Sequence, residues 1–154
     1  MANLKQAARR IIEEVYGQGR VEVLDELCHP GYVSHDPLTG DADLAGEKAY
    51  VRLLRACFPN LEARILALHM EGDTVIAHWH MEGNLARRLL GVEPQGQHIT
   101  LEGLTVFEFE HGRLVEDSSQ WDTFGYLRQL GLIQPLAPMS EAPEVGERTA
   151  SSPH

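Results

Sequence analysis

The sequence is short of cysteine, of basic residues and of long apolar runs. Its two cysteines, Cys28 and Cys57, form no CxxC pair, so neither a disulfide framework nor a zinc site is indicated. Lysine and arginine number 13 against 23 aspartates and glutamates, and the formal charge of -10 argues against a nucleic-acid partner. No apolar run reaches the length of a bilayer, and the first residues lack the pattern of a signal peptide. We therefore expect a cytoplasmic protein without a membrane partner.

The chain length allows one well-buried core. A chain of 154 residues with 43% hydrophobic content suits one domain and is short for two of ordinary size. We expect this domain to cover residues 1–133. Residues 134–154 contain four prolines and almost no core-forming side chains, so we expect a flexible or loosely attached tail there.

Hydrophobic spacing in the first part of the chain is helical. Apolar residues recur every three or four positions in residues 4–16, 21–28 and 46–58, which predicts three helices. The inward stripe of the third predicted helix consists of Ala49, Leu53, Leu54 and Cys57.

From residue 61 onward the spacing changes to the period of a strand. The predicted strands cover residues 61–70, 74–82, 99–110 and 113–121, with turn residues that predict two antiparallel hairpins. These elements predict an α+β fold in which N-terminal helices pack on a strongly curved antiparallel sheet, forming a cone with an internal pocket. We expect the loop over residues 85–97 to close over that pocket.

Asp122 lies where the last predicted strand meets a short helical pattern that ends near Gly131. A carboxylate at a strand end beside Trp121 can be partly desolvated, which raises its pKa toward a value useful for a general base. Aspartate is also a favoured N-cap residue, and such a cap stabilises a helix by about 1 kcal/mol. Position alone does not separate a catalytic role from a capping role, and one side chain can have both.

Histidines and aromatic residues mark the predicted pocket. His35 precedes a turn and is the second catalytic candidate, the alternative being a turn histidine bonded to Asp36. His78 and His80 alternate with apolar residues on one strand, so they point to solvent or to the pocket rim if the apolar face is core. Candidate substrate-binding residues are Tyr16, Trp79, His80, Leu89, Phe107, Gln120 and Trp121.

A cupin-like metal centre is a rival interpretation of the same histidines. Gly72 followed by His78-Trp79-His80 matches the start of the first cupin motif, and imidazoles two apart on a strand can share a metal. The remainder of that motif is missing, because no glutamate stands four or five residues after His80. We therefore predict no metal site.

Several segments, in the right order, resemble the SnoaL-like polyketide cyclases, a branch of the cone-shaped α+β family named after nuclear transport factor two. The resemblance extends from about residue 11 to residue 133 and is carried by segments with the sequences Tyr32-Val33-Ser34-His35-Asp36-Pro37, Cys57-Phe58-Pro59-Asn60-Leu61, Glu71-Gly72-Asp73-Thr74-Val75, Gly91-Val92-Glu93-Pro94-Gln95-Gly96, Glu110-His111-Gly112-Arg113-Leu114-Val115-Glu116, Trp121-Asp122 and Gln129-Leu130-Gly131.

The resemblance implies a reaction. In that family the aspartate at the position of Asp122 is the general acid and base of an intramolecular aldol ring closure that needs no metal or cofactor. The chain departs from the family at Gly83-Asn84-Leu85, where Gly-Thr-His is common, and at Ser118, where tryptophan is common. The implied partner is a small hydrophobic carbonyl compound.

Two other functions fit the same fold. One is a non-catalytic module for ligand binding or dimerisation, in which Asp122 only caps the helix. The other is an isomerase or hydratase that uses the same pocket and carboxylate. Leu104 and Val106 lie on one face of a predicted strand and need to be buried, so we also expect a homodimer.

Overall fold

The computed structural model describes residues 3–134, and it begins with a helical layer. Its members are α1 (Leu4–Arg10), the π-helical segment η1 (Ile11–Tyr16), α2 (Glu22–Leu27) and α3 (Leu44–Cys57). The first predicted helix is thus continuous from Leu4 to Tyr16 but changes its winding at Ile11. The predicted tail lies outside the described residues, apart from Gln134.

Within the described residues, six strands form a single sheet, in the order β2-β1-β6-β5-β4-β3. The strands are β1 (Cys28–Asp36), β2 (Gly40–Asp43), β3 (Glu62–Glu71), β4 (Thr74–Asn84), β5 (His98–Glu110) and β6 (Arg113–Trp121). The predicted hairpins β3–β4 and β5–β6 are confirmed, and β4 also pairs antiparallel with β5.

The expectation of a wholly antiparallel sheet was wrong at one position. Strand β1 pairs in parallel with β6, and β2, which the sequence pattern did not predict, forms the edge of the sheet against β1. The tight turn after β1 allows only antiparallel pairing with β2, whereas the long connection between β1 and β6 allows these two strands to be parallel.

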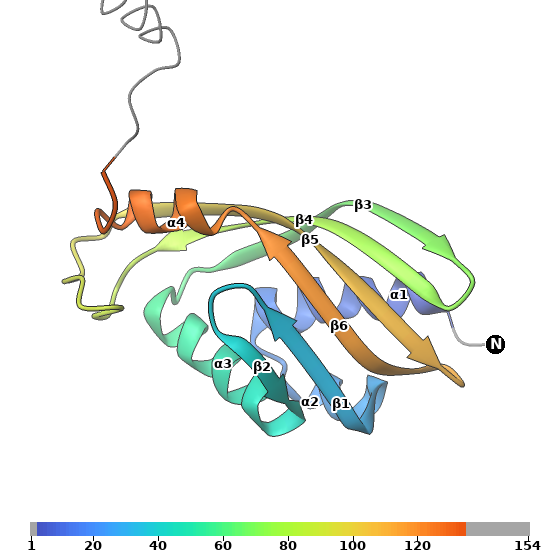
Figure 1. The fold of residues 1–154 in the computed structure, drawn as a ribbon. Helices are drawn as coiled ribbons and strands as arrows, with labels where there is room; N and C mark the ends of the chain where they lie inside the picture. The colour runs from blue at the N-terminus through green and yellow to red at the C-terminus, as the bar shows by residue number, and fades with distance from the viewer. Residues whose placement is uncertain (1–2, 135–154) are drawn as a thin grey trace, which may run out of the picture.

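The architecture is α+β, with helices on one face of a curled sheet. Figure 1 shows α1, α2 and α3 under the concave side, while the sheet remains open because β2 and β3 are separate edges. The short helix α4 (Thr123–Gln129) follows β6 and packs near the start of β5, where Gln129 bonds to Thr100. This curl leaves a space between the helices and the sheet, and the functional site described below is built around it.

The core lies between the helices and the inner face of the sheet. Along β4, Val75, Ala77, Trp79 and Met81 are buried, as the alternation in the sequence predicted. The predicted stripe of the third helix was wrong at two of its four residues. Ala49 is exposed and Leu53 is 53% exposed, whereas Leu54 and Cys57 are buried together with Glu47 and Val51. A helix that begins at Leu44 directs Glu47 inward, so one carboxylate lies on the buried face.

Candidate functional site

Two adjoining chambers lie between α3, η1 and the inner face of the sheet. The apolar chamber measures about 50 Å³ and the polar chamber about 210 Å³. They meet at five residues that line both, namely Tyr16, Asp36, Glu47, Tyr50 and Ser119. Most of the lining of the polar chamber comes from the turn after β1, from β2 and from the start of α3.

The walls of the apolar chamber are aliphatic and aromatic. Trp79 on β4 and Trp121 on β6 face it from either side of Gly103 on β5, to which both are paired in register. A Cβ atom at Gly103 would lie 2.5 Å from the Cβ of Trp121 and 2.8 Å from Cζ2 of Trp79. Glycine is therefore required here for the two indole rings to occupy this wall.

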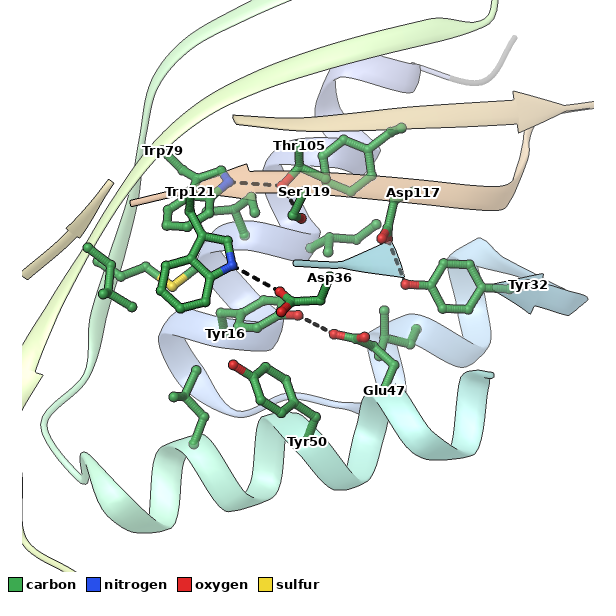
Figure 2. A pocket seen from close by; sticks show the side chains of 17 residues that line it. Tyr16, Tyr32, Asp36, Glu47, Tyr50, Trp79, Thr105, Asp117, Ser119 and Trp121 are labelled. Carbon is green, nitrogen blue, oxygen red and sulfur yellow. Dashed lines mark hydrogen bonds between the residues drawn. The ribbon is translucent and has the colours of Figure 1, made fainter. Parts of the chain in front are cut away.

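Three carboxylates from three different elements converge on this cavity. Asp36 ends β1, Glu47 lies in the first turn of α3, and Asp117 lies in the middle of β6. Figure 2 shows the three side chains around one space, with Tyr16, Tyr32 and Tyr50 beside them. Carboxylates in a largely apolar enclosure have altered proton affinity, and this arrangement is typical of acid/base sites.

Asp117 is a buried carboxylate in the wall of the apolar chamber. Its Oδ2 accepts a hydrogen bond from the Tyr32 hydroxyl at 2.6 Å, and its Oδ1 accepts one from the Ser34 hydroxyl at 2.9 Å. Burial raises the pKa of Asp117 from 3.8 to about 7, the negative Glu47 adds to the increase, and the two hydrogen bonds oppose it. Near neutral pH this carboxyl group can both accept and donate a proton.

Glu47 is buried as well and is held by a tyrosine. The Tyr16 hydroxyl donates to its Oε1, and burial raises the pKa of Glu47 although this hydrogen bond opposes the increase. Burial and the charge of Glu47 raise the pKa of Tyr16, so that this phenol stays protonated and remains a donor.

Asp36 lines both chambers and also stabilises the local structure. Its Oδ1 accepts from the backbone N–H groups of Leu38 at 2.8 Å and Thr39 at 3.0 Å, which closes the turn between β1 and β2. Its Oδ2 accepts from Nε1 of Trp121 at 3.0 Å, as Figure 2 shows. The same carboxylate thus fixes the turn and the orientation of an indole ring in the cavity wall.

The cavity also contains neutral hydroxyl groups. Nε1 of Trp79 donates to Oγ1 of Thr105 at 2.9 Å, and that hydroxyl is bonded to the Ser119 hydroxyl at 2.8 Å. The Tyr50 hydroxyl borders both chambers and has no hydrogen-bond partner among residues 3–134. Burial and the charge of Asp36 raise the pKa of Tyr50, which keeps its hydroxyl available as a donor.

Asp122 is outside the lining of both chambers. Its exposed side chain accepts from the backbone N–H of Gly125 at 2.8 Å, which confirms the predicted N-cap of α4. A Cβ at Gly125 would lie 2.1 Å from Oδ2 of Asp122, so a larger residue at position 125 would require this carboxylate to shift. Asp122 lies outside the cavity because successive side chains along β6 point to opposite faces of the sheet. Trp121 points into the cavity, so its neighbour Asp122 points away.

His35, the second catalytic candidate, faces away from the cavity. Its ring nitrogens bond to Asp41 and to Glu116, both at 2.7 Å, rather than to Asp36. These two carboxylates raise the pKa of His35 above 6.5. The side chain therefore links β1 to β2 and β6, and it lines neither chamber.

The predicted substrate-binding residues divide into two groups. Tyr16, Trp79, Phe107 and Trp121 line the apolar chamber, and their contact with a ligand stays a prediction. Three others are outside the lining: His80 bonds to Glu82 at 2.7 Å, Gln120 is exposed, and Leu89 lies in the loop over residues 85–97. That loop lines neither chamber, and its ends are tied to each other by hydrogen bonds between Leu85 and Gln97 and between Gly96 and Leu85.

The sequence contained a signal for the acidic residues that were missed. Asp117 and Ser119 share a strand face with Trp121, so the expectation that Trp121 lines the cavity also places Asp117 there. The prediction from the sequence was based on the other face of this strand, which carries Glu116, Ser118 and Gln120 and continues to Asp122. Glu47 could be found from its spacing to Val51 and Leu54, one and two helical turns later.

The histidines of the cupin-like fragment lie on the outer face of the sheet. His78 bonds to Glu102 at 3.0 Å and His80 bonds to Glu82. Within residues 3–134, no group of three or more histidine, cysteine, aspartate or glutamate side chains is arranged to hold a metal ion. None of the helices in this part of the chain has the length and apolar character needed to cross a membrane.

Several solved structures are similar to this chain. A candidate polyketide cyclase from Acidithiobacillus ferrooxidans is 31% identical, with a TM-score of 0.75, and the match covers 83% of this chain and 94% of that chain. IdmH from Streptomyces antibioticus, also a candidate polyketide cyclase, is 25% identical, with a TM-score of 0.74 and coverage of 84% and 99%.

A more distant neighbour shows the fold alone. A protein of ketosteroid isomerase-like fold from Catenulispora acidiphila, solved in complex with trimethylamine, is 14% identical, with a TM-score of 0.67 and coverage of 88% and 98%. A search of curated protein sequences gives no match.

The family model described as SnoaL-like polyketide cyclase matches residues 6–130, which is most of the chain. The chain therefore belongs to the SnoaL-like polyketide cyclase family.

Proposed function

We propose that this protein is a polyketide cyclase-type enzyme that performs acid/base catalysis on a small hydrophobic carbonyl compound, without a cofactor. The observation that carries the proposal is Asp117, a buried carboxyl group in the wall of a largely apolar cavity, with a pKa of about 7. A general base works best when its pKa lies near the working pH, because it is then ionised yet still basic.

The chemistry needs one proton acceptor that later returns the proton. Asp117 takes a proton from the methylene group between two carbonyl groups, and the C–H electron pair becomes an enolate. The enolate carbon then forms a C–C bond with a second carbonyl carbon of the same molecule, which leaves an alkoxide. Protonated Asp117 gives its proton to that alkoxide, so the carboxylate is regenerated and no other reactant is consumed.

The enolate needs a hydrogen-bond donor while it carries negative charge. Tyr50 fits this role because its hydroxyl lies at the junction of the chambers and has no partner among residues 3–134. The raised pKa of Tyr50 keeps the proton on the phenol, so the group donates without competing for the substrate proton.

Deuterium exchange at the methylene of 1-phenylbutane-1,3-dione tests this function directly. NMR in deuterated buffer measures how fast the protein exchanges that position, independently of any ring closure. We expect acceleration by the wild-type protein, and a loss of about 10²–10⁴-fold in the Asp117→Asn variant, the range that a general base contributes. The Tyr50→Phe variant should lose less, because it removes a donor but leaves the base.

The same assay tests the candidates predicted from the sequence. Asp122→Asn preserves the cap of α4, since asparagine is an equally good N-cap residue. Loss of exchange in Asp122→Asn or in His35→Gln, with exchange retained in Asp117→Asn, would contradict the assignment to Asp117.

Ligand binding without turnover is the second candidate function. Both oxygens of Asp117 already accept hydrogen bonds, from Tyr32 and Ser34. This favours binding without turnover, because these bonds occupy the atoms that would take the substrate proton. In that case the dione would bind, as measured by tryptophan fluorescence, while its methylene exchanged no faster than in buffer.

We also propose that the protein is a homodimer formed through the outer face of the sheet. Ile76 is paired with Val106, and the neighbouring Leu104 is 47% exposed, so three apolar side chains lie together on that face. Light scattering should give twice the mass of the chain, and Leu104→Glu should convert the dimer to monomer. A wild-type protein that is monomeric at high concentration would contradict this proposal.

A cytoplasmic location is part of the same proposal. Cys28 and Cys57 are buried free thiols, as is usual for proteins kept in a reducing compartment. Fractionation of cells that produce the protein with its native sequence tests the location, and recovery in a secreted fraction would contradict it.

A further inference from the structure

A short chain of hydrogen bonds crosses the inner face of the sheet from β4 to β6. Nε1 of Trp79 donates to Oγ1 of Thr105 at 2.9 Å, and Thr105 is bonded in turn to the hydroxyl of Ser119 at 2.8 Å. Thr105 and Ser119 are register partners on β5 and β6, so their side chains lie on the same face of the sheet. Figure 2 shows Trp79, Thr105 and Ser119 together on one side of the cavity.

The indole fixes the direction of this chain. An indole N–H can only donate, so Oγ1 of Thr105 is an acceptor toward Trp79. Thr105 is buried, and within residues 3–134 its hydroxyl has no partners other than Trp79 and Ser119. A buried hydroxyl proton without an acceptor is strongly unfavourable. The Thr105 hydroxyl therefore donates to Ser119, and Ser119 accepts this bond.

The Ser119 hydroxyl is left with a free proton at the junction of the two chambers. Ser119 lines both chambers, and among the described residues the only hydrogen-bond partner of its hydroxyl is Thr105. Since Ser119 accepts that bond, it can donate its own proton to a molecule in the cavity. The chain behind it polarises this O–H group and makes it a stronger donor. The Tyr50 hydroxyl borders the same junction, so two donors are available there.

Ser119 has a suitable spacing from the proposed base. It lies two residues after Asp117 on β6, and both side chains line the apolar chamber. Two residues along a strand correspond to a Cα–Cα distance of about 6–7 Å. A 1,3-dicarbonyl compound whose methylene group lies against Asp117 can therefore place one carbonyl oxygen at Ser119. Proton removal puts negative charge on that oxygen.

We propose that the Ser119 hydroxyl, oriented by Thr105, donates a hydrogen bond to the carbonyl oxygen of the bound molecule and then to the enolate oxygen. Together with Tyr50 it forms a pair of donors arranged in advance for the charge that develops in the reaction. Ser34 has a different role, because its hydroxyl is already bonded to Asp117. The catalytic part of this inference rests on the proposed function.

Dione exchange measures what Ser119 contributes to turnover. We expect Ser119→Ala to slow the exchange of 1-phenylbutane-1,3-dione about 10–100-fold, because Tyr50 remains as a donor and loss of a single oxyanion donor costs about 10²–10³-fold. Ser119→Cys keeps the size of the side chain but replaces a strong donor by a weak one, so its loss should be similar. Ser118→Ala is the matched control, since Ser118 is the exposed neighbour on the opposite face of β6, and its rate should stay at the wild-type value.

Infrared spectroscopy tests the hydrogen bond itself and needs no turnover. The probe is acetophenone labelled with carbon-13 at its carbonyl group, and the fluorescence of Trp79 and Trp121 in the apolar chamber reports its binding. A hydrogen bond weakens the C=O bond, so the stretching band should lie at lower frequency in the wild type and Ser118→Ala than in Ser119→Ala. Thr105→Val should move the band part of the way toward that of Ser119→Ala, because Ser119 then loses the bond that orients it.

The two measurements separate this inference from the proposed function. A band that shifts in Ser119→Ala, in a protein that does not accelerate dione exchange, would support the hydrogen bond from Ser119 and contradict the proposed catalysis. Exchange that is lost in Asp117→Asn but unchanged in Ser119→Ala would overturn the inference and leave the proposed function intact. Equal bands in the wild type and in the Ser119 variants, or no binding of acetophenone, would also overturn it. An unchanged band in Thr105→Val would contradict the role of Thr105. If Ser119→Ala fails to fold, as judged by circular dichroism, Ser119→Cys gives the same comparison.

Discussion

Replacing Asp117 by asparagine should change how stability depends on pH. In the native protein the pKa of Asp117 is raised to about 7, whereas in the unfolded chain it returns to about 3.8. Between these values the native state holds a proton that the unfolded state has lost, so the stability of the wild-type protein falls as pH rises through this window. Below pH 3.8 both states are protonated and the penalty disappears.

The magnitude follows from the distance between the two pKa values. That distance is about three pH units, and each unit corresponds to about 1.4 kcal/mol, so Asp117 removes about 4 kcal/mol of stability between pH 4 and pH 8. Asparagine has a similar shape, can accept from Tyr32 through its oxygen and can donate to the Ser34 hydroxyl. It removes the buried charge and leaves the local hydrogen bonds possible.

Urea unfolding at pH 4, 6 and 8 measures the effect. The quantity of interest is the free energy of unfolding of Asp117→Asn minus that of the wild type. We expect this difference to increase by about 4 kcal/mol from pH 4 to pH 8. Glu47 and His35 also have raised pKa values and leave a residual slope in the variant. The Glu47→Gln variant measures how much of the residual pH dependence comes from Glu47. A constant difference between wild type and Asp117→Asn over this range would refute the assignment of a raised pKa to Asp117.

Three further predictions concern the surroundings of the site. Asp122→Ala should lower the free energy of unfolding by about 1 kcal/mol and Asp122→Asn by much less, as measured by thermal unfolding, because only alanine removes the cap; equal losses would contradict a pure capping role. Gly103→Ala should destabilise the protein by about 1–3 kcal/mol and shift its tryptophan fluorescence, because the new Cβ collides with Trp121; unchanged urea midpoint and spectrum would mean that this wall is loosely packed. An NMR titration of His35 should give a midpoint above 6.5 that falls in Glu116→Gln, and an unshifted midpoint would show that the Glu116 bond is not formed in solution.

The local patterns of the sequence were sufficient for much of the architecture. Alternation identified the four strands after residue 61 and the buried face of β4, because a strand with one side in the core shows a period of two whatever its neighbours are. Helical spacing identified the inward face of residues 4–16 in the same way. The family followed from the order of short segments and was shown by the match over residues 6–130.

The candidate site could be predicted only in part. Four aromatic residues of the cavity wall, Tyr16, Trp79, Phe107 and Trp121, were named from the sequence, since large side chains on apolar faces are directed inward. The catalytic candidates Asp122 and His35 were chosen from their places at element ends. In the structure Asp122 caps α4, His35 bonds to Asp41 and Glu116, and other carboxylates are directed inward.

What the sequence determined by itself was therefore the local periodicity, the class of the fold and the family. The tertiary structure alone decided which acidic residues meet, because Glu47 and Asp117 are 70 residues apart in the chain and come together only through the parallel pairing of β1 with β6 and the packing of α3 against β1. Their burial, and with it the raised pKa of each, depends on that long-range arrangement. No local pattern contains it, since a carboxylate on a strand or helix has its ordinary pKa until the rest of the fold removes the water around it.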